Sequence, residues 1–260
     1  MTTATTPTHA ARQARNPAAS ARRVLNLARY EVLLLVRNKV MLFNALLVAP
    51  LMVFVILSLI DVPLATADVI MMTALWAAMF VVYLNLTAIF VSRREDRVFA
   101  RMETGEASKW EALCAAAIPS SAIMVLQLLG AGVLGAYMFG GTALAEPVLA
   151  PIGLLLTIVI FAALAAATTA ITKTVEAAQL TTMPVLIAAS LTSGMTLPLG
   201  FLPEIVQTIA AATPLNALAA LVLPGFEIAD LPIGPLGVLL IWTVLSIALA
   251  RRYTTFAARR

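Results

Sequence analysis

The sequence predicts an all-α integral membrane protein with six transmembrane helices. Of its 260 residues, 62% are apolar and only 12% are charged, which is more apolar surface than one water-soluble core can bury. Six apolar segments carry no Asp, Glu, Lys or Arg and are close to the roughly 20 residues that cross the hydrocarbon of a bilayer. They are residues 41–60, 69–91, 113–139, 151–172, 177–198 and 233–250.

The distribution of positive charge predicts how these spans are oriented. With six spans, all 17 Lys and Arg residues, from Arg12 to Arg260, fall in the ends and connections that share one side. The positive-inside rule makes that side cytoplasmic. We therefore expect a multi-pass protein of the cytoplasmic (inner) membrane, with both termini in the cytoplasm.

Residues 203–223 form a further apolar stretch, but Pro214 interrupts it and each half is too short to span. A seventh span here would place the C-terminal arginines outside. The sequence therefore favours re-entrant outer half-helices between spans five and six. A loosely ordered outer loop is the alternative.

The chain before the first span divides into two parts. Residues 1–20 contain no apolar run and are expected to form a disordered cytoplasmic tail. Residues 252–260, after the transmembrane domain of residues 41–251, are expected to form a second cytoplasmic tail. Residues 21–40 predict an amphipathic connecting helix, with Arg22, Arg29 and Arg37 in one sector and Val24 and Leu35 opposite. Such a helix lies in the interface plane, either as a membrane anchor alone or as an element that transmits force.

The cytoplasmic loop at residues 93–112 carries both charged and apolar residues. It is expected to be helical to about Thr104 and to stop at Gly105, with Ser108 and Glu111 as a capping box for the next helix. A charged run of this kind is usually a solvated loop. Phe99 and Trp110 instead favour a docking surface.

Chemistry-bearing motifs are missing from the sequence. Cys114 is the single cysteine and His9 the single histidine, so neither an internal disulfide nor a histidine metal cluster is expected. Lys39, Lys109 and Lys173 are never preceded by Gly, which excludes a phosphate-binding loop. We expect no enzyme activity, no catalytic residue and no metal site in this chain by itself, and any ATP must bind a separate subunit.

The polar residues within the spans are uncharged. Ion-coupled carriers usually keep charged groups there, so their absence argues against a secondary transporter. Asn44, Asn85 and Gln127 remain as polar groups at membrane depth. Single residues of this kind are more often packing contacts between helices than ligand contacts.

Three ordered motifs carry a resemblance to a known family. Residues 28–43 read ARYEVLLLVRNKVMLF, residues 93–113 read RREDRVFARMETGEASKWEAL, and residues 193–221 read SGMTLPLGFLPEIVQTIAAATPLNALAAL. In this order and topology they resemble the permease (transmembrane) subunit of a type-two ABC exporter, of the ABC-2 family. The resemblance covers nearly the whole chain after the tail.

The resemblance implies a function and partners. It implies the permease of an ATP-driven ABC exporter that moves a hydrophobic or amphipathic compound, such as a drug or a lipid-like molecule, outward. The implied partners are two ABC ATPase subunits, a second permease copy or paralogue, and membrane lipid, with no nucleic acid. ATP and Mg would sit on the partner ATPase, and no cofactor is expected in this chain. An ion-coupled secondary transporter and a non-transporting membrane assembly protein remain alternatives.

The resemblance also implies sites. The family's coupling helix corresponds to residues 93–105, and the turn at 173–176 corresponds to a second contact. The implied ATPase contacts are Glu95, Arg97, Phe99, Arg101, Glu103, Gly105, Lys173 and Glu176. A substrate path at the permease dimer interface is implied along the second and fifth spans, at Asn85, Thr182, Ser190, Ser193 and Met195.

Overall fold

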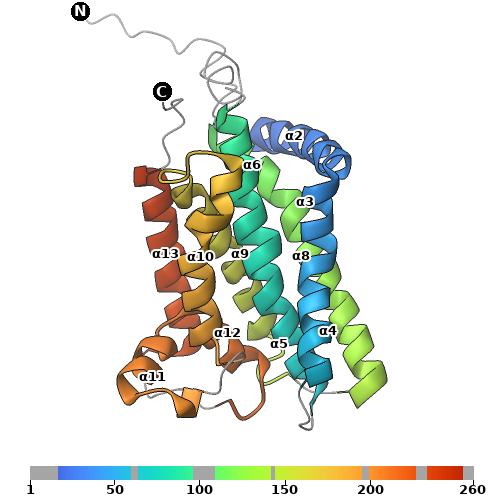
Figure 1. The fold of residues 1–260 in the computed structure, drawn as a ribbon, viewed down its shortest axis with the longest axis vertical. Helices are drawn as coiled ribbons and strands as arrows, with labels where there is room; N and C mark the ends of the chain where they lie inside the picture. Colours follow the sequence, from blue (N-terminus) through green and yellow to red (C-terminus); the bar gives the residue numbers. More distant parts are fainter. Residues whose placement is uncertain are drawn as a thin grey trace, which may run out of the picture.

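The structure is a computed structural model that describes residues 17–59, 64–95, 109–141, 144–194, 199–226 and 233–253. Over these residues the chain is helical and contains no strand. Six helical segments are long and apolar enough to cross a membrane, and they run side by side as a bundle (Figure 1). The predicted fold class is confirmed.

Two of the spans are built from several helical pieces. The first consists of α3 (Lys39–Phe43), the π-helical η1 (Asn44–Val48) and α4 (Ala49–Leu59). The second consists of α5 (Thr66–Trp76), the π-helical η2 (Ala77–Leu84) and α6 (Asn85–Glu95). The others are α8 (Lys109–Phe139), α9 (Leu149–Thr168), α10 (Val175–Thr192) and α13 (Pro235–Tyr253).

The second span forms the centre of the bundle. Its most apolar stretch is 78% buried, whereas the corresponding stretches of the first and fifth spans are 17% buried. Tyr83 meets the ring of Phe161 on α9 edge to face, with centroids 6.1 Å apart. Its hydroxyl shares a 2.8 Å hydrogen bond with the Thr168 hydroxyl, the partner that a buried tyrosine needs. The second and fourth spans are thus joined in the core, and the first and fifth keep exposed apolar faces.

All Lys and Arg residues in the described segments lie at one end of the bundle, which we call the arginine-rich end. It is formed by α2 (Pro17–Arg37), the last turn of α6, the first turn of α8, the turn between α9 and α10, and the last turn of α13 (Figure 1). Asp68, Glu146 and Glu204 lie at the opposite end. The one-sided charge expected from the sequence is therefore present in the described residues.

The second and third spans are longer than a bilayer requires. Each has 30 residues, which at 1.5 Å per residue gives about 45 Å, against about 30 Å of hydrocarbon. Charged residues mark the surplus, because Arg93 and Arg94 end the second span and Glu111 begins the third. These turns therefore reach beyond the apolar part of the bundle to the level of α2.

Helix α2 lies across the arginine-rich end rather than along the bundle (Figure 1). It begins at Pro17, so residues 17–20 are helical rather than part of the tail expected at 1–20. Proline is favourable in the first turn of a helix because its missing N–H would be unpaired there. The helix ends at Arg37, and the Asn38 side-chain oxygen accepts a 3.1 Å hydrogen bond from the Met41 N–H, which caps α3. This turn leads the chain into the first span.

The π-helical stretch η1 faces a polar side chain of α8. The Gln127 amide donates to the carbonyl oxygens of Ala45 and Leu46, at 2.8 and 3.2 Å. A π-helical turn disturbs the regular pairing of backbone carbonyls, and an amide from a neighbouring helix can satisfy them. Gln127 therefore acts as a packing contact between the first and third spans.

Between the fifth and sixth spans, α11 (Glu204–Ala211) and α12 (Pro214–Val222) form a pair bent by 77°. Most of α12 is buried in the bundle. Its last carbonyls, of Leu221 and Val222, accept hydrogen bonds from the backbone N–H groups of Glu146 and Ala145. Helix α10 ends and α13 begins at the end of the bundle opposite the arginine-rich end, so the bent pair enters and leaves the bundle at that same end (Figure 1). The segment is helical rather than a loose loop.

Two spans end earlier than the sequence predicted. Helix α9 ends at Thr168 rather than at 172, and α10 ends at Thr192 rather than at 198. Gly194 follows with φ +75°, a left-handed conformation that stops a helix and favours glycine. The other predicted span limits differ from the helices by a few residues, the usual spread at helix ends.

A glycine permits close contact between α5 and α8, which gives a testable prediction. A Cβ added at Gly135 would lie 3.1 Å from the Thr66 Cα, so Gly135→Ala must push the two helices apart. We expect a loss of about 1–3 kcal/mol in the free energy of unfolding, seen as a lower thermal midpoint of the purified protein in detergent. Gly130→Ala on the same helix is the control, since nothing lies within 4 Å of its added Cβ. An equal effect of both substitutions would contradict the close packing.

Candidate functional site: the arginine-rich end and its grooves

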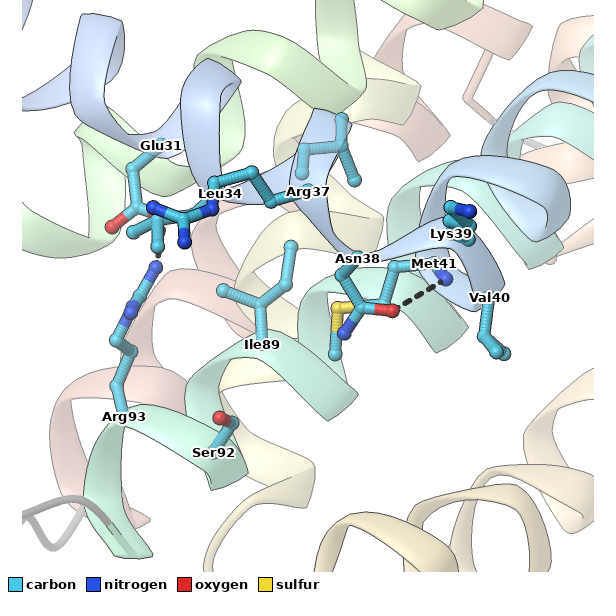
Figure 2. Close-up of a pocket in the computed structure, with 11 residues that line it drawn as sticks. Glu31, Leu34, Arg37, Asn38, Lys39, Val40, Met41, Ile89, Ser92 and Arg93 are labelled. Carbon is cyan, nitrogen blue, oxygen red and sulfur yellow. Dashed lines mark hydrogen bonds and ion pairs between the residues drawn. The ribbon is translucent and has the colours of Figure 1, made fainter.

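Two ion pairs attach α2 to the long spans. Arg23 Nη2 lies 2.9 Å from Glu111 Oε1 at the start of α8, and the Ser20 hydroxyl donates to the same oxygen at 2.5 Å. Arg93 Nη2 lies 2.6 Å from Glu31 Oε2, as Figure 2 shows. All four side chains are at most 22% exposed. These pairs are therefore less screened by solvent than ordinary surface pairs.

The two pairs lie on either side of one segment of the chain. Arg93 comes shortly before residues 96–108, and Glu111 comes shortly after them. This segment, which holds most of the predicted coupling helix, lies outside the described residues. Helix α2 therefore contacts the chain on both flanks of this segment.

Arg94 connects the end of the second span to the end of the fourth. It is only 5% exposed, and its guanidinium donates to the carbonyl oxygens of Thr169 at 2.5 Å, of Lys173 at 3.1 Å, and of Thr172. These carbonyls follow the last turn of α9, where the helix dipole is negative. A guanidinium has the fixed fork of donors that suits several acceptors at once. Arg94 thus holds the turn between α9 and α10 against the base of the predicted coupling helix.

The implied ATPase contacts fall into two groups. Glu95, Lys173 and Glu176 are exposed at the arginine-rich end. Lys173 precedes α10, and Glu176 is in the first turn of this helix. Thr174 caps the helix, because its hydroxyl accepts a hydrogen bond from the Ala177 N–H. The others lie outside the described residues: Arg97, Phe99, Arg101, Glu103 and Gly105.

The apolar face of α2 is divided between two environments. Ala28 and Leu35 are buried against the bundle, while Leu25, Val32 and Val36 on the adjoining strip of the helix are about half exposed. Arg22, Arg29 and Arg37 point to the remaining sector and are exposed. A helix that is packed on one strip, apolar on the next and basic on the third matches the environment at a membrane surface.

A groove of about 660 Å³ opens between α2, the start of α3 and the last turns of α6. Figure 2 shows its lining, with the Glu31–Arg93 ion pair on one side and Asn38 on the other. Arg37 and Lys39 add positive charge at its rim, and Leu35 and Ile89 supply apolar walls. The groove therefore combines an apolar floor with a charged edge.

A second groove of about 260 Å³ adjoins the first, and Asn38, Val40 and Met41 line both grooves. It lies between the first, second and fifth spans, and Asn44, Asn85 and Gln179 give it polar lining. The Asn85 amide nitrogen is buried and has no hydrogen-bond partner among the described residues. An unpaired buried donor costs about 1–3 kcal/mol, so this nitrogen is suited to bind an acceptor atom that enters the groove.

The implied substrate-path residues are not all brought together. Asn85 lines the second groove. Thr182 is fully buried on α10, and its hydroxyl donates to the Ala178 carbonyl of its own helix at 2.7 Å. The Ser193 hydroxyl donates to the Ser190 carbonyl at 2.7 Å, near the opposite end of α10. Met195 lies outside the described residues.

Sequence reasoning missed several of these interactions. Glu31 is an acidic residue within a basic amphipathic helix, and the sequence did not show that it pairs with Arg93. Arg94 could not be distinguished by sequence from Arg93, which pairs with Glu31 of α2. In the described part of the chain, no three His, Cys, Asp or Glu side chains are grouped so that they could hold a metal ion.

A protein-family model matches most of the chain. The family model described as "ABC-2 type transporter" matches residues 22–225. The match begins in α2 and ends just after α12, so it includes both grooves, the bent pair, and the arginine-rich end apart from the start of α2 and the last turn of α13. No curated protein matches the chain.

Proposed function

The chain belongs to the ABC-2 type transporter family, and from this premise we propose that it is the permease subunit of an ATP-driven exporter. It is a multi-pass membrane protein, and permeases of this family are normally non-catalytic. ATP would be hydrolysed, with Mg, on two separate ATPase subunits. A second permease, either a copy of this chain or a paralogue, would complete the complex.

The observation that carries this proposal is the connected set of contacts at the arginine-rich end. The ion pairs of Arg23 and Arg93 and the carbonyl contacts of Arg94 link three elements: α2, the flanks of residues 96–108, and the turn before α10. In our proposal the ATPase binds residues 96–108 together with Lys173 and Glu176. A movement of the ATPase then reaches the second, third and fifth spans together.

This proposal requires the arginine-rich end to face the cytoplasm, where ATP is. The positive-inside rule supports that orientation. In our proposal the protein spans the cytoplasmic membrane, and both of its termini lie in the cytoplasm. In inside-out vesicles, added protease should remove a tag from either terminus. Protection of either tag in such vesicles would contradict the orientation.

The proposed cargo is a hydrophobic or amphipathic compound, drug-like or lipid-like. The spans offer no charged side chain along their apolar length, and the grooves beside the first span combine apolar walls with amide groups. Asn85 would then donate a hydrogen bond to a polar atom of the compound. We propose the second groove as the part of the path that this chain contributes, with outward movement driven by ATP.

Replacing both Phe99 and Arg101 with Ala is expected to uncouple the complex. An apolar and a charged contact with the ATPase would be lost together, so ATP hydrolysis should no longer respond to the permease. The permease itself should insert normally, because neither residue lies within a span. Retained coupling, measured as ATP hydrolysis by the complex in proteoliposomes, would contradict the placement of the coupling helix.

Transport in inside-out vesicles separates this proposal from an ion-coupled carrier. With a panel of amphipathic fluorescent dyes, uptake should require ATP and should persist when an ionophore removes the ion gradients. Uptake without ATP that disappears with the ionophore would support the carrier instead. A membrane assembly protein would bind its partners but would leave their ATP hydrolysis unresponsive to every compound.

A further inference from the structure

The outer surface of the bundle carries a third groove, separate from those beside the first span. It has a volume of about 650 Å³ and lies between α8, α9 and α13. Its floor is made of small side chains, with Ala162, Ala163 and Ala166 on α9 and Ala117 on α8. Small residues at these positions leave a depression between the larger residues of α8 and α13.

The extent of the groove along α8 fits within one leaflet of a bilayer. Its lining runs from Trp110 to Ser121, which is about 16 Å of helix at 1.5 Å per residue. One leaflet, from its headgroup region to the midplane, is about 20–22 Å thick. The groove therefore begins at headgroup level, at the arginine-rich end, and extends into the acyl chains of a single leaflet.

The mouth of the groove has the chemistry of a headgroup site. Arg251 and Trp110 stand at the arginine-rich end of the lining, and both side chains are exposed. Below them the lining is apolar apart from Cys114 and Ser121, and the Ser121 hydroxyl donates to the Ala117 carbonyl of its own helix. A guanidinium binds phosphate oxygens in pairs, and tryptophan prefers the level of the headgroups.

We propose that this groove binds one phospholipid of the leaflet at the arginine-rich end, with its phosphate on Arg251 and one acyl chain along the alanines of α9. The positive charge at the mouth and the one-leaflet length together favour a phospholipid over a second copy of this chain or a soluble ligand. The site does not depend on the proposed transport function. It lies beside Trp110, close to the point where residues 96–108 join α8.

Photocrosslinking tests this site in the full-length protein. The chain is reconstituted in vesicles of phosphatidylcholine and phosphatidylglycerol that contain a phospholipid with a photoreactive acyl chain, and the labelled residues are mapped. We expect labelling concentrated in residues 110–121 and 158–166. Labelling spread evenly over the exposed faces of all the spans would overturn the proposal.

Matched variants make the test specific. Ala163→Phe fills the floor of the groove and should reduce labelling there roughly tenfold, whereas Ala248→Phe, at an exposed position of α13, should leave it unchanged. Arg251→Gln, a mild change in an exposed residue, should also weaken labelling, while Arg252→Gln should not. Unchanged labelling in both Ala163→Phe and Arg251→Gln would contradict the site.

The single cysteine tests whether a second copy of this chain, rather than a lipid, occupies the groove. Cys114 lines the groove and is exposed. If a lipid fills the groove, mild oxidation of membranes should leave the chain monomeric on a non-reducing gel. A disulfide-linked dimer through Cys114 would place a second copy there and overturn the lipid assignment.

Discussion

Replacing Arg94 with Met is expected to give the largest loss of function among the described residues. The substitution keeps a long side chain but removes the guanidinium. The carbonyls of Thr169, Thr172 and Lys173 then lose the hydrogen bonds that Arg94 donates to them. Thr169 and Thr172 are buried, and each of their carbonyls left unpaired costs about 1–3 kcal/mol. We expect a clearly lower thermal midpoint and, in the assembled complex, loss of the link between the second span and the turn before α10.

Two controls separate this effect from a general loss of positive charge. Arg29→Met removes an exposed arginine of α2 and should change the thermal midpoint little. Arg94→Lys keeps the charge but not the planar fork of donors, so it should fall between the wild type and Arg94→Met. If Arg94→Met and Arg29→Met have the same midpoint, the carbonyl contacts of Arg94 contribute nothing to stability.

Reversing the charge of Glu111 is expected to detach α2 from the third span. In Glu111→Arg, a second guanidinium replaces the carboxylate that now lies 2.9 Å from the Arg23 guanidinium. The Arg23 and Glu111 side chains are mostly buried, at 22% and 10% exposed. Breaking such a pair costs more than losing a surface pair, up to about 3–5 kcal/mol when burial is complete. We expect a lower thermal midpoint and loss of stimulated ATP hydrolysis in the complex.

The double variant Arg23→Glu with Glu111→Arg restores opposite charges with their positions exchanged. It should recover much of both measurements, because the attraction between the two groups is re-formed. Arg22→Glu, at the exposed neighbouring position of α2, is the matched control and should not rescue Glu111→Arg. Failure of the exchanged pair to recover more than this control would mean that the Arg23–Glu111 contact is not what attaches α2.

The fold could be predicted because the membrane imposes simple constraints on the sequence. A span needs about 20 apolar residues, and a charge within it is costly, so the six segments and the common side of the arginines can be identified directly. Pro214 likewise predicted the break between α11 and α12. Helix ends were less predictable. Helix α10, for example, ends at Thr192, just before Gly194 with its positive φ. A glycine in an apolar run does not by itself indicate a left-handed turn.

The site was less predictable because its contacts join distant parts of the chain. Glu31 and Arg93 are 62 residues apart, and Arg23 and Glu111 are 88 apart. Their pairing depends on how α2 is rotated about its axis, which the packing of Ala28 and Leu35 against the bundle decides. Arg93 and Arg94 are adjacent in sequence, yet one pairs with α2 and the other holds the end of α9.

Copurification tests the central claim, that this membrane protein works with a separate ATPase, most directly. The full-length chain is tagged at its C-terminus, solubilised in mild detergent from membranes of its own cells, and purified, and the proteins that remain bound are identified and assayed for ATP hydrolysis. We predict a stoichiometric ATPase subunit with a phosphate-binding Walker motif, and its reduced recovery with the Phe99 and Arg101 double substitution. A pure, folded permease that never retains such a subunit and shows no ATP hydrolysis would contradict the claim.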